Sequence, residues 1–411
     1  MTSHKRPMIA FLLVAAATVQ ASADDGVAEL EKLYRLKCGR CHTAYPAEKY
    51  SGEDWETIVA EMAPRSGLDE ETQEGILAYL RGAASKGSGG GLPTTPVLSG
   101  YLYTEYFASP AAVDTFDVHY LNLAVSGRLY ERVSYKAEFE FEHGGGKSEP
   151  PFVEQAFIDV KLTRGLNLRI GAMLTPFNRF DDLHGPLENP LVTRLQISRE
   201  IGVSAWKEVG VDLHGSLPLH DDFFVFYDAY AINGLGGGSR LRGSRQYRDN
   251  NDAKSLGARV GGVIADRWEL GASYYRGAWD DEGELDLTSY GFHLLGRVQE
   301  LTLHLEFARS RSENYEPTAT GEAEGFFLAG SYLFGGRLRP TVRFGTLDYL
   351  DPGDLLNRKT TDRNPSTLAF GVNFHLTSGV VFKAEYDLIT EGDRHAEEDN
   401  NLLAFQAAVR F

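Results

Sequence analysis

The sequence predicts two differently built parts, a small all-α domain followed by an all-β transmembrane barrel of about 16 antiparallel strands. Between residues 24 and 83, apolar residues recur at helical spacing. From residue 97 to 411, apolar and polar residues alternate in segments of roughly ten residues. The stretch 84–96 between them is rich in glycine, serine and proline, which is the composition of a flexible linker.

The first 23 residues have the pattern of an export signal. Lys5 and Arg6 form a basic start, the run 8–19 is apolar, and Ala-Ser-Ala at 21–23 matches a cleavage site. We therefore assign 1–23 to a signal peptide and expect the mature chain to begin near Asp24. Without Lys5 and Arg6 the chain has 39 basic and 58 acidic residues, a net charge of −19. Such an acidic protein is a poor partner for nucleic acid.

The sequence Cys38-Gly39-Arg40-Cys41-His42 has the pattern C-x-x-C-H, which attaches a c-type haem through two thioethers and an axial histidine. Cys38 and Cys41 are the only cysteines of the chain, so no second pair completes a zinc site. A small loop closed by a disulfide is the alternative. We expect one covalently bound haem c, with His42 as an iron ligand.

The second axial ligand of the iron is inferred by elimination. Met62 is the only methionine between Asp24 and Gly82, and no histidine other than His42 lies there. A thioether opposite a histidine raises the reduction potential of a haem and suits electron transfer. The alternative is that Met62 only fills core space beside Trp55.

Three helices are expected around the haem. The first precedes the motif, the second follows a capping box at 51–54 and carries Trp55 and Met62 on one face, and the third runs from about 69 to 81 and ends at Gly82. With its motif after a first helix, its tryptophan and methionine on a middle helix, and its Ile-x-x-Tyr-Leu ending, the segment resembles a small class I cytochrome c. The resemblance implies a c-type cytochrome domain over 24–83.

The alternating part of the chain, 97–411, divides into sixteen segments, the first at 97–107 and the last at 400–411. Bacterial single-chain barrels have an even number of strands, an apolar outer face and a polar interior. A soluble β-sandwich would instead turn the apolar set towards a core. Tight connections such as 131–132 and 377–378 alternate with mostly longer ones, which is the outer-membrane pattern. The terminal strand ends in Phe411 and resembles the assembly signal of outer-membrane proteins.

Alternation assigns charges of both signs to the barrel interior. The longest connection, 176–205, is the third on the long-loop side. In general porins the third loop folds inward. A resemblance of this barrel to the general porins implies a constriction here, with an ordinary surface loop as the alternative. The acidic runs 249–252 and 280–282 are expected to be solvated loop tips. The charged residues assigned to the interior are Glu138, Glu140, Asp159, Arg169, Asp212, Glu306, Arg337, Arg339, Arg343, Glu385 and Asp387.

A haem segment followed by a sixteen-stranded barrel resembles the fused cytochrome–porins of the outer membrane, among them the iron oxidases of iron-oxidising bacteria. The resemblance implies an outer-membrane protein of a Gram-negative bacterium, with its haem domain on the periplasmic side or within the lumen. It implies a monohaem electron carrier rather than a classical enzyme, with Fe(II) oxidation as a candidate activity. Its implied partners are outer-membrane lipid, periplasmic electron carriers, and a metal ion or other redox donor outside the cell or in the lumen.

A hypothesis from another class is a solute-diffusion porin that carries a tethered periplasmic cytochrome. A third is a haem sensor or peroxidase. That reading needs an open sixth position on the iron, and a ligating Met62 argues against it.

Overall fold

The computed structural model describes residues 30–35, 37–38, 45, 47, 50, 55–56, 58–59, 62 and 68–87 of the N-terminal part of the chain. Further along it describes 96–130, 132–145, 151–194, 196–201, 206–220, 222–237, 246–315, 320–350, 364–392 and 396–411. The chain forms two compact units, Met1–Gly90 and Gly91–Phe411. The predicted signal peptide and most of the predicted linker lie outside the described residues.

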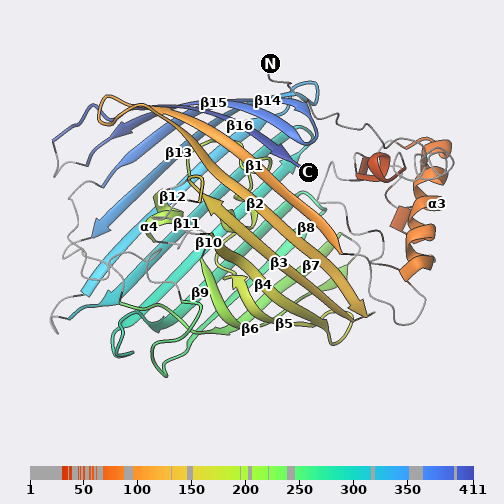
Figure 1. The fold of residues 1–411 in the computed structure, drawn as a ribbon, viewed down its shortest axis with the longest axis horizontal. Coiled ribbons are helices and arrows are strands. Elements are labelled where there is room, and N and C mark those ends of the chain that lie inside the picture. Colours follow the sequence, from red (N-terminus) through yellow and green to blue (C-terminus); the bar gives the residue numbers. More distant parts are fainter. Residues whose placement is uncertain are drawn as a thin grey trace, which may run out of the picture. The chain divides into compact units, whose positions relative to one another are not determined.

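The N-terminal unit is helical at residues 30–35, 37–38, 55–56, 58–59 and 62, and its helix α3 spans Glu70–Gly87 (Figure 1). Asp69 caps α3, because its Oδ1 accepts a hydrogen bond from the Thr72 backbone N–H at 2.8 Å. Hydrogen bonding from Thr72 also lowers the pKa of Asp69.

The predicted end of this helix at Gly82 is wrong, since α3 continues to Gly87. Glycine in a helix interior costs only about 1 kcal/mol relative to alanine, so a single exposed glycine does not end a helix by itself. The first residues of the stretch predicted as a linker are therefore helical.

The second unit is built from sixteen strands in chain order (Figure 1). They are β1 (Val97–Ala108), β2 (Thr115–Tyr130), β3 (Val133–Glu142), β4 (Phe152–Lys161), β5 (Asn167–Leu174), β6 (Lys207–His220), β7 (Phe223–Ile232), β8 (Ser255–Ile264), β9 (Trp268–Ala278), β10 (Asp286–Val298), β11 (Leu301–Glu313), β12 (Thr320–Tyr332), β13 (Leu338–Leu350), β14 (Ser366–Thr377), β15 (Val380–Thr390) and β16 (Leu402–Arg410).

The sheet closes on itself because β1 pairs with both β2 and β16. All neighbours are antiparallel, and the seam runs from Tyr101 opposite Arg410 to Ala108 opposite Leu403. Beyond it, Gly100 and Phe411 exchange two backbone hydrogen bonds of 3.0 Å. The predicted fold class is confirmed for the barrel, and the even strand number leaves both barrel termini on the side of the short turns.

The two faces of the strands differ as the alternation predicts. In β3, Phe139 is 43% exposed, whereas Glu138 and Glu140 on either side of it are 8% and 1% exposed. Lipid takes up apolar side chains at no cost, while charges need the polar interior. The outward set is apolar around the barrel and includes Ile158, Ile170, Val211, Val260, Phe292, Phe344, Phe370 and Phe382.

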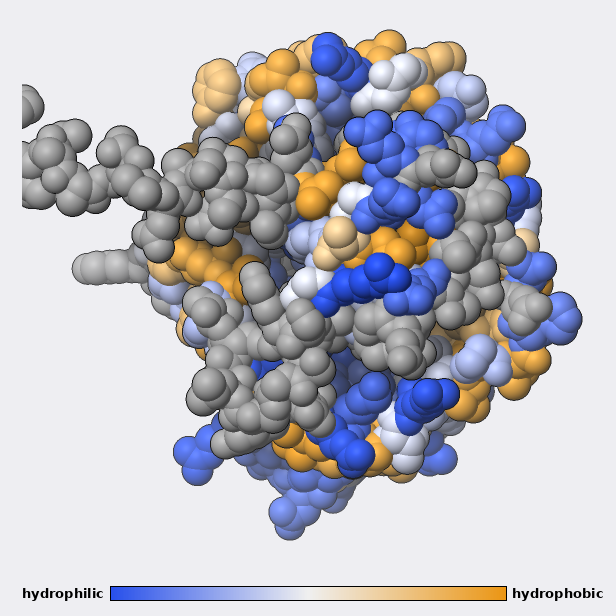
Figure 2. Space-filling model, turned by 90° about the vertical axis from the view of Figure 1, so that its right-hand side faces the viewer, coloured by the Kyte–Doolittle hydropathy of each residue, from blue (hydrophilic) through white to orange (hydrophobic). Residues whose placement is uncertain are grey.

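Short turns join the strand pairs at one end of the barrel. Glycine suits the turn between β12 and β13, where Gly335 and Gly336 have φ of 53° and 70°. Figure 2 shows hydrophilic residues intermixed with hydrophobic ones on the side of the molecule that it draws. Among the described residues, no helix is both long and apolar enough to cross a membrane.

Candidate haem site and the barrel interior

The N-terminal unit has an apolar core made by separate parts of the sequence. Trp55, Ile76 and Leu80 are almost completely buried, together with Tyr34 and Val59. The rings of Tyr34 and Trp55 meet edge to face with centroids 6.0 Å apart, a favourable aromatic geometry. The helix before the haem motif, the segment 55–59 and α3 therefore share one core.

Two hydrogen bonds attach the segment after the motif to this core. The Tyr34 hydroxyl donates to the Tyr45 carbonyl at 2.7 Å, and the Trp55 indole N–H donates to the Ala47 carbonyl, also at 2.7 Å. Burial raises the pKa of Tyr34, so this hydroxyl keeps its proton. Each polar group on these aromatic side chains is thereby satisfied inside an apolar environment.

The structure describes two of the four predicted haem-site residues. Cys38 lies in a helical stretch and is half-buried, with its side chain packed against the core around Trp55. Met62 is helical and half-buried. Cys41 and His42 lie outside the described residues. The assignment of Cys38, Cys41, His42 and Met62 to haem therefore stays a prediction.

The described surroundings fit a haem in their chemistry. A thiol at the edge of an aromatic and aliphatic core can hold one side of a porphyrin against apolar side chains. Histidine nitrogen and methionine sulfur are the axial donors of electron-transfer haems. Bound there, a haem would supply a one-electron redox centre, and the protein residues would set its ligation and its exposure to water.

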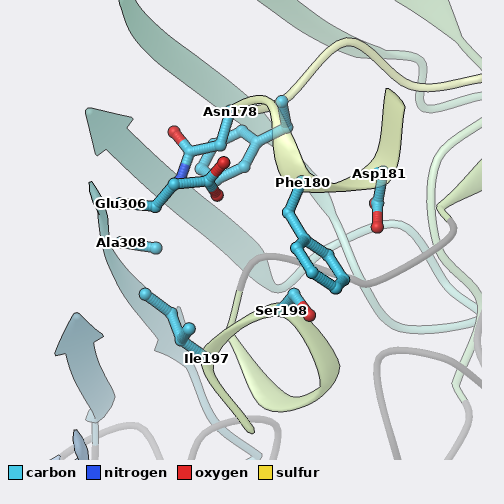
Figure 3. A pocket seen from close by; sticks show the side chains of 8 residues that line it. Asn178, Phe180, Asp181, Ile197, Ser198, Glu306 and Ala308 are labelled. Carbon is cyan, nitrogen blue, oxygen red and sulfur yellow. The ribbon is translucent and has the colours of Figure 1, made fainter. Parts of the chain in front are cut away.

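The long connection between β5 and β6 lies inside the barrel, as the resemblance to general porins implied. It contains a 3-10 helix, η1 (Phe180–Leu183), and a short helix, α4 (Gln196–Glu200). Phe177, Phe180, Ile197 and Ile201 of this inner loop pack in one buried cluster with inward-facing wall residues such as Tyr275 and Phe327. Figure 3 shows Phe180 and Ile197 close to Ala308 of the β11 wall, around a small pocket that Glu306 also lines.

Hydrogen bonds fasten the first half of the inner loop to the wall at β8–β11. The Asn178 backbone N–H donates to Ser273 Oγ at 2.9 Å, and the Arg179 backbone N–H donates to Glu306 Oε1 at 3.0 Å. Arg259 of β8 donates to the Asn178 carbonyl at 2.8 Å and to Asp182 Oδ2 at 2.7 Å. These contacts join residues about 80 to 130 positions apart.

The second half of the inner loop is fastened to another part of the wall, at β13 and β15. Glu385 accepts hydrogen bonds from the Val192 and Thr193 backbone N–H groups and from the Thr193 hydroxyl. Arg343 donates to the Thr193 carbonyl at 3.0 Å, and Lys383 donates to the Asn189 carbonyl at 2.8 Å. The inner loop therefore bridges two walls of the barrel and narrows its interior.

Asp182 is an electrostatic anchor of the inner loop. It forms ion pairs with Arg259 and Arg179, both at 2.7 Å. Partial desolvation would raise the pKa of Asp182, but these two guanidinium groups outweigh it and hold the pKa below its usual value. The carboxylate therefore stays charged at neutral pH.

Most of the charges assigned to the interior from the sequence are buried there. The sequence reading identified Arg343, Glu385 and Glu306 as interior charges, and all three hold the inner loop. It did not include Arg259 or Asp228. Arg259 was detectable, because apolar Ala258 and Val260 flank it and the alternation then places it on the inward face.

Comparison with known proteins assigns the larger unit to a protein family. Residues 99–394 match the model of the Gram-negative porins, and residues 34–106 match that of the dihaem cytochromes c. The fold and these matches define an outer-membrane β-barrel fused to a cytochrome. The chain belongs to the Gram-negative porin family, its membrane is the outer membrane of Gram-negative bacteria, and its architecture is that of a fused cytochrome–porin.

Solved structures share the barrel fold at low sequence identity. An OmpT variant of Vibrio cholerae lacking loop L8 is 14% identical, with a TM-score of 0.55, over 77% of this chain and 99% of that chain. The channel DcaP of Acinetobacter baumannii is 11% identical, with a TM-score of 0.56, over 78% and 98%. An anion-selective porin from Comamonas acidovorans is 10% identical, with a TM-score of 0.57, over 77% and 98%. At these identities the likeness shows the fold alone.

An uncharacterized protein of Aquifex aeolicus is 29% identical over 144 residues, which is 34% of this chain. The match spans about a third of the length of that curated relative, 32%.

The expectation of a single haem is corrected by the family match. The matching cytochrome family is dihaem, which points to two haems rather than one. The expected number came from the two cysteines, which make one C-x-x-C-H motif. The number of C-x-x-C-H motifs gives only the number of haems attached through two thioethers within one chain. It gives no information about a haem that is held in another way.

Proposed function

We propose that this protein transfers electrons at the outer membrane, between a donor or acceptor that is extracellular or in the lumen and carriers in the periplasm. The observation that carries the proposal is the fusion itself, a cytochrome segment and a porin barrel in one chain. A redox domain covalently continuous with a membrane-spanning barrel is held at the membrane that its electrons would have to cross.

In this proposal Cys38 and Cys41 hold a porphyrin, and His42 and Met62 ligate its iron. The barrel begins at Val97 on the side of the short turns, which face the periplasm in outer-membrane proteins. This supports a haem domain on the periplasmic side or within the lumen, close to periplasmic carriers. Fe(II) outside the cell is the donor that the resemblance to iron oxidases suggests.

A second candidate function is solute diffusion through the barrel, with the cytochrome as a tethered periplasmic domain. Membership of the porin family favours this candidate. The inner loop bears on both functions, because it lies in the interior and is held there by Arg259 of β8 and Glu385 of β15. A narrowed lumen limits the size of solutes and also shortens the gap between a lumenal donor and protein groups.

The deciding experiment places the holoprotein, in one orientation, in sealed liposomes that enclose a redox dye. The orientation is fixed by a tag inserted within residues 351–363, between β13 and β14, and a membrane-impermeant reductant small enough to enter the barrel is added outside. We expect haem reduction, read from its absorbance bands, before reduction of the enclosed dye when the long-loop side faces outward. Haem reduction that only follows dye reduction would contradict transfer from the lumen or the outer face and would favour the diffusion porin.

A matched control separates haem reduction from leakage. The same liposomes are prepared with the short-turn side facing outward, where the reductant reaches the haem domain directly in both models. Haem reduction in this orientation confirms that the haem is competent. Reduction in this orientation, with no haem reduction before dye reduction when the long-loop side faces outward, would reject the proposed function.

A further inference from the structure

Three metal-ligating side chains converge at the long-loop end of β2 and β3. Asp117 and His119 come from β2, and His143 directly follows β3. One ligand atom from each residue lies within 4.8 Å of the others. We propose that Asp117, His119 and His143 form a binding site for a divalent transition-metal ion at the outer rim of the barrel. We call these three residues the rim cluster.

The distances within the rim cluster suit a single ion. Asp117 Oδ2 lies 2.7 Å from His143 Nδ1 and 3.7 Å from His119 Nδ1. Ligand atoms on one ion with bonds of 2.0–2.2 Å are about 3.0 to 4.3 Å apart, for neighbouring and opposite positions respectively. Asp117 therefore needs shifts of only a few tenths of an ångström relative to each histidine to share a metal with it.

The donor set selects the class of ion. Two imidazole nitrogens and one carboxylate suit Zn²⁺, Fe²⁺, Co²⁺ or Ni²⁺, whereas Ca²⁺ and Mg²⁺ prefer oxygen ligands alone. Glu105 of β1 also contacts His119 Nδ1 and adds a second negative charge beside the cluster. Two carboxylates thus lie beside the two imidazoles, and a divalent ion would balance their negative charge.

Neighbouring residues fix the orientation of His119. A β-bulge in β2 opposite Thr104 lets His119 and Tyr120 face the interior together, and their rings stack with centroids 4.5 Å apart. Glu105 is held in turn by Gln406, whose amide donates to Glu105 Oε1 at 2.7 Å. Such outer contacts are the kind that orient metal ligands and tune their affinity.

His143 completes the cluster from the adjacent strand. Its backbone N–H donates to the His119 carbonyl at 3.1 Å, so the two histidines are direct cross-strand neighbours. Their rings lie 4.9 Å apart, and the His143 side chain is 42% exposed. The cluster is therefore preformed and reachable by water and ions from the long-loop side, which faces outward in outer-membrane barrels.

A second group with ligand potential, Glu140, Glu154 and His184, lies deeper in the barrel. There the Lys207 ammonium contacts both carboxylates, at 3.2 Å from Glu140 and closer to Glu154. A lysine already balances these carboxylates, so a metal ion would have to displace it. The rim cluster differs because its carboxylates contact histidines, which are themselves metal ligands.

The test measures zinc binding to the full-length holoprotein in detergent. After chelator treatment, the protein is dialysed against Zn²⁺, bound zinc is counted by elemental analysis, and affinity is measured by competition with a chromophoric chelator. We expect the wild type to bind one more zinc ion than His119→Ala/His143→Ala. Asp117→Asn, which keeps the side-chain shape, should weaken that ion at least tenfold.

The matched control is His214→Ala/His220→Ala, which removes two histidines from β6 and should keep the wild-type zinc content. Circular dichroism checks that each variant forms the barrel, and Asp117→Asn keeps the test decisive if the double histidine variant does not fold. Equal zinc content and affinity in wild type, Asp117→Asn and the β6 control would overturn the proposal. The readout is bound zinc, so the result is independent of whether the protein transfers electrons.

Discussion

At the residue scale, Met62 is the predicted haem ligand with the most direct test. If its sulfur ligates the iron opposite His42, Met62→Ala leaves that position empty or taken by water. The reduced spectrum of this haem should then become high-spin, and its reduction potential should fall. Absorbance spectroscopy and redox titration of the full-length protein measure both effects.

The control Met62→Leu separates ligation from packing. Leucine keeps nearly the volume of methionine, and such exchanges usually cost less than about 1.5 kcal/mol in a core. A ligand role predicts that Met62→Leu loses the low-spin spectrum as completely as Met62→Ala. Retention of the low-spin spectrum in Met62→Leu would mean that Met62 only fills space.

Residues that form a site together could be predicted where they are close in sequence or lie on one helix or strand. The motif from Cys38 to His42 can be read directly, because its ligands are fixed by local spacing. The rim cluster was missed because His119 and His143 are 24 positions apart. The signal was present, since a hairpin with its turn at 131–132 places residues 119 and 143 opposite each other. A bulge in β2 then disturbs the alternation at Tyr120 and hides the pattern.

At the element scale, the inner loop depends on Arg259. Arg259→Ala removes the contacts to Asp182 and the Asn178 carbonyl, and it leaves Asp182 and Asp228 without that partner. Breaking a buried ion pair from one side costs about 3–5 kcal/mol. We expect a loosened loop and a higher, noisier single-channel conductance in planar bilayers.

The control for this substitution is Arg309→Ala. Arg309 pairs with Glu322 and Glu324 between neighbouring strands and is only half-buried. Partly exposed pairs contribute about 0–1 kcal/mol. A conductance change of the same size in both variants would show that barrel stability, and not the inner loop, controls the pore.

The pH dependence of the pore follows from Asp182. Its folded pKa is held below the ordinary value of about 3.9, so its stabilising effect is complete above that value and is lost as pH falls through the lower folded pKa. Conductance should therefore be steady from pH 7 to about 4 and rise only in stronger acid. Asp182→Asn should remove this acid step, and an identical step in the variant would assign it to other groups.

Strands were predicted closely because lipid outside and water inside impose a strict period of two. The predicted 97–107 and 133–143 became Val97–Ala108 and Val133–Glu142. Loops obey no such rule. The run 280–282 was expected to be a solvated tip, yet Asp280 is buried and its Oδ1 accepts hydrogen bonds from the Glu284 and Leu285 backbone N–H groups. A carboxylate that caps a turn cannot be told from a solvated one by composition.

At the scale of the whole molecule, the N-terminal unit is expected to fold without the barrel. Its core joins Tyr34, Trp55 and Ile76 of the same unit. Residues 24–87, exported together with haem-attachment machinery, should yield a soluble red protein with the spectrum of the intact chain. The fragment ends at Gly87 because α3 does. A fragment 24–81, cut inside α3, is the control and should hold haem less stably. Haem loss from both fragments would show that the N-terminal unit needs the barrel to bind haem.

Conduction distinguishes a haem domain that enters the lumen from one that hangs below it. A hydrocarbon core about 30 Å thick separates the two faces, so a haem at the periplasmic mouth cannot exchange electrons directly with an outside donor. The glycine-rich composition of residues 88–96 predicts a mean reach of about 15–18 Å, which permits partial entry without requiring it. If the domain enters, deleting residues 24–87 should raise single-channel conductance, and Arg259→Ala should raise it further. If the domain hangs below an open barrel, deletion should leave conductance unchanged, and an outside donor would then have to pass the inner loop to reach the haem.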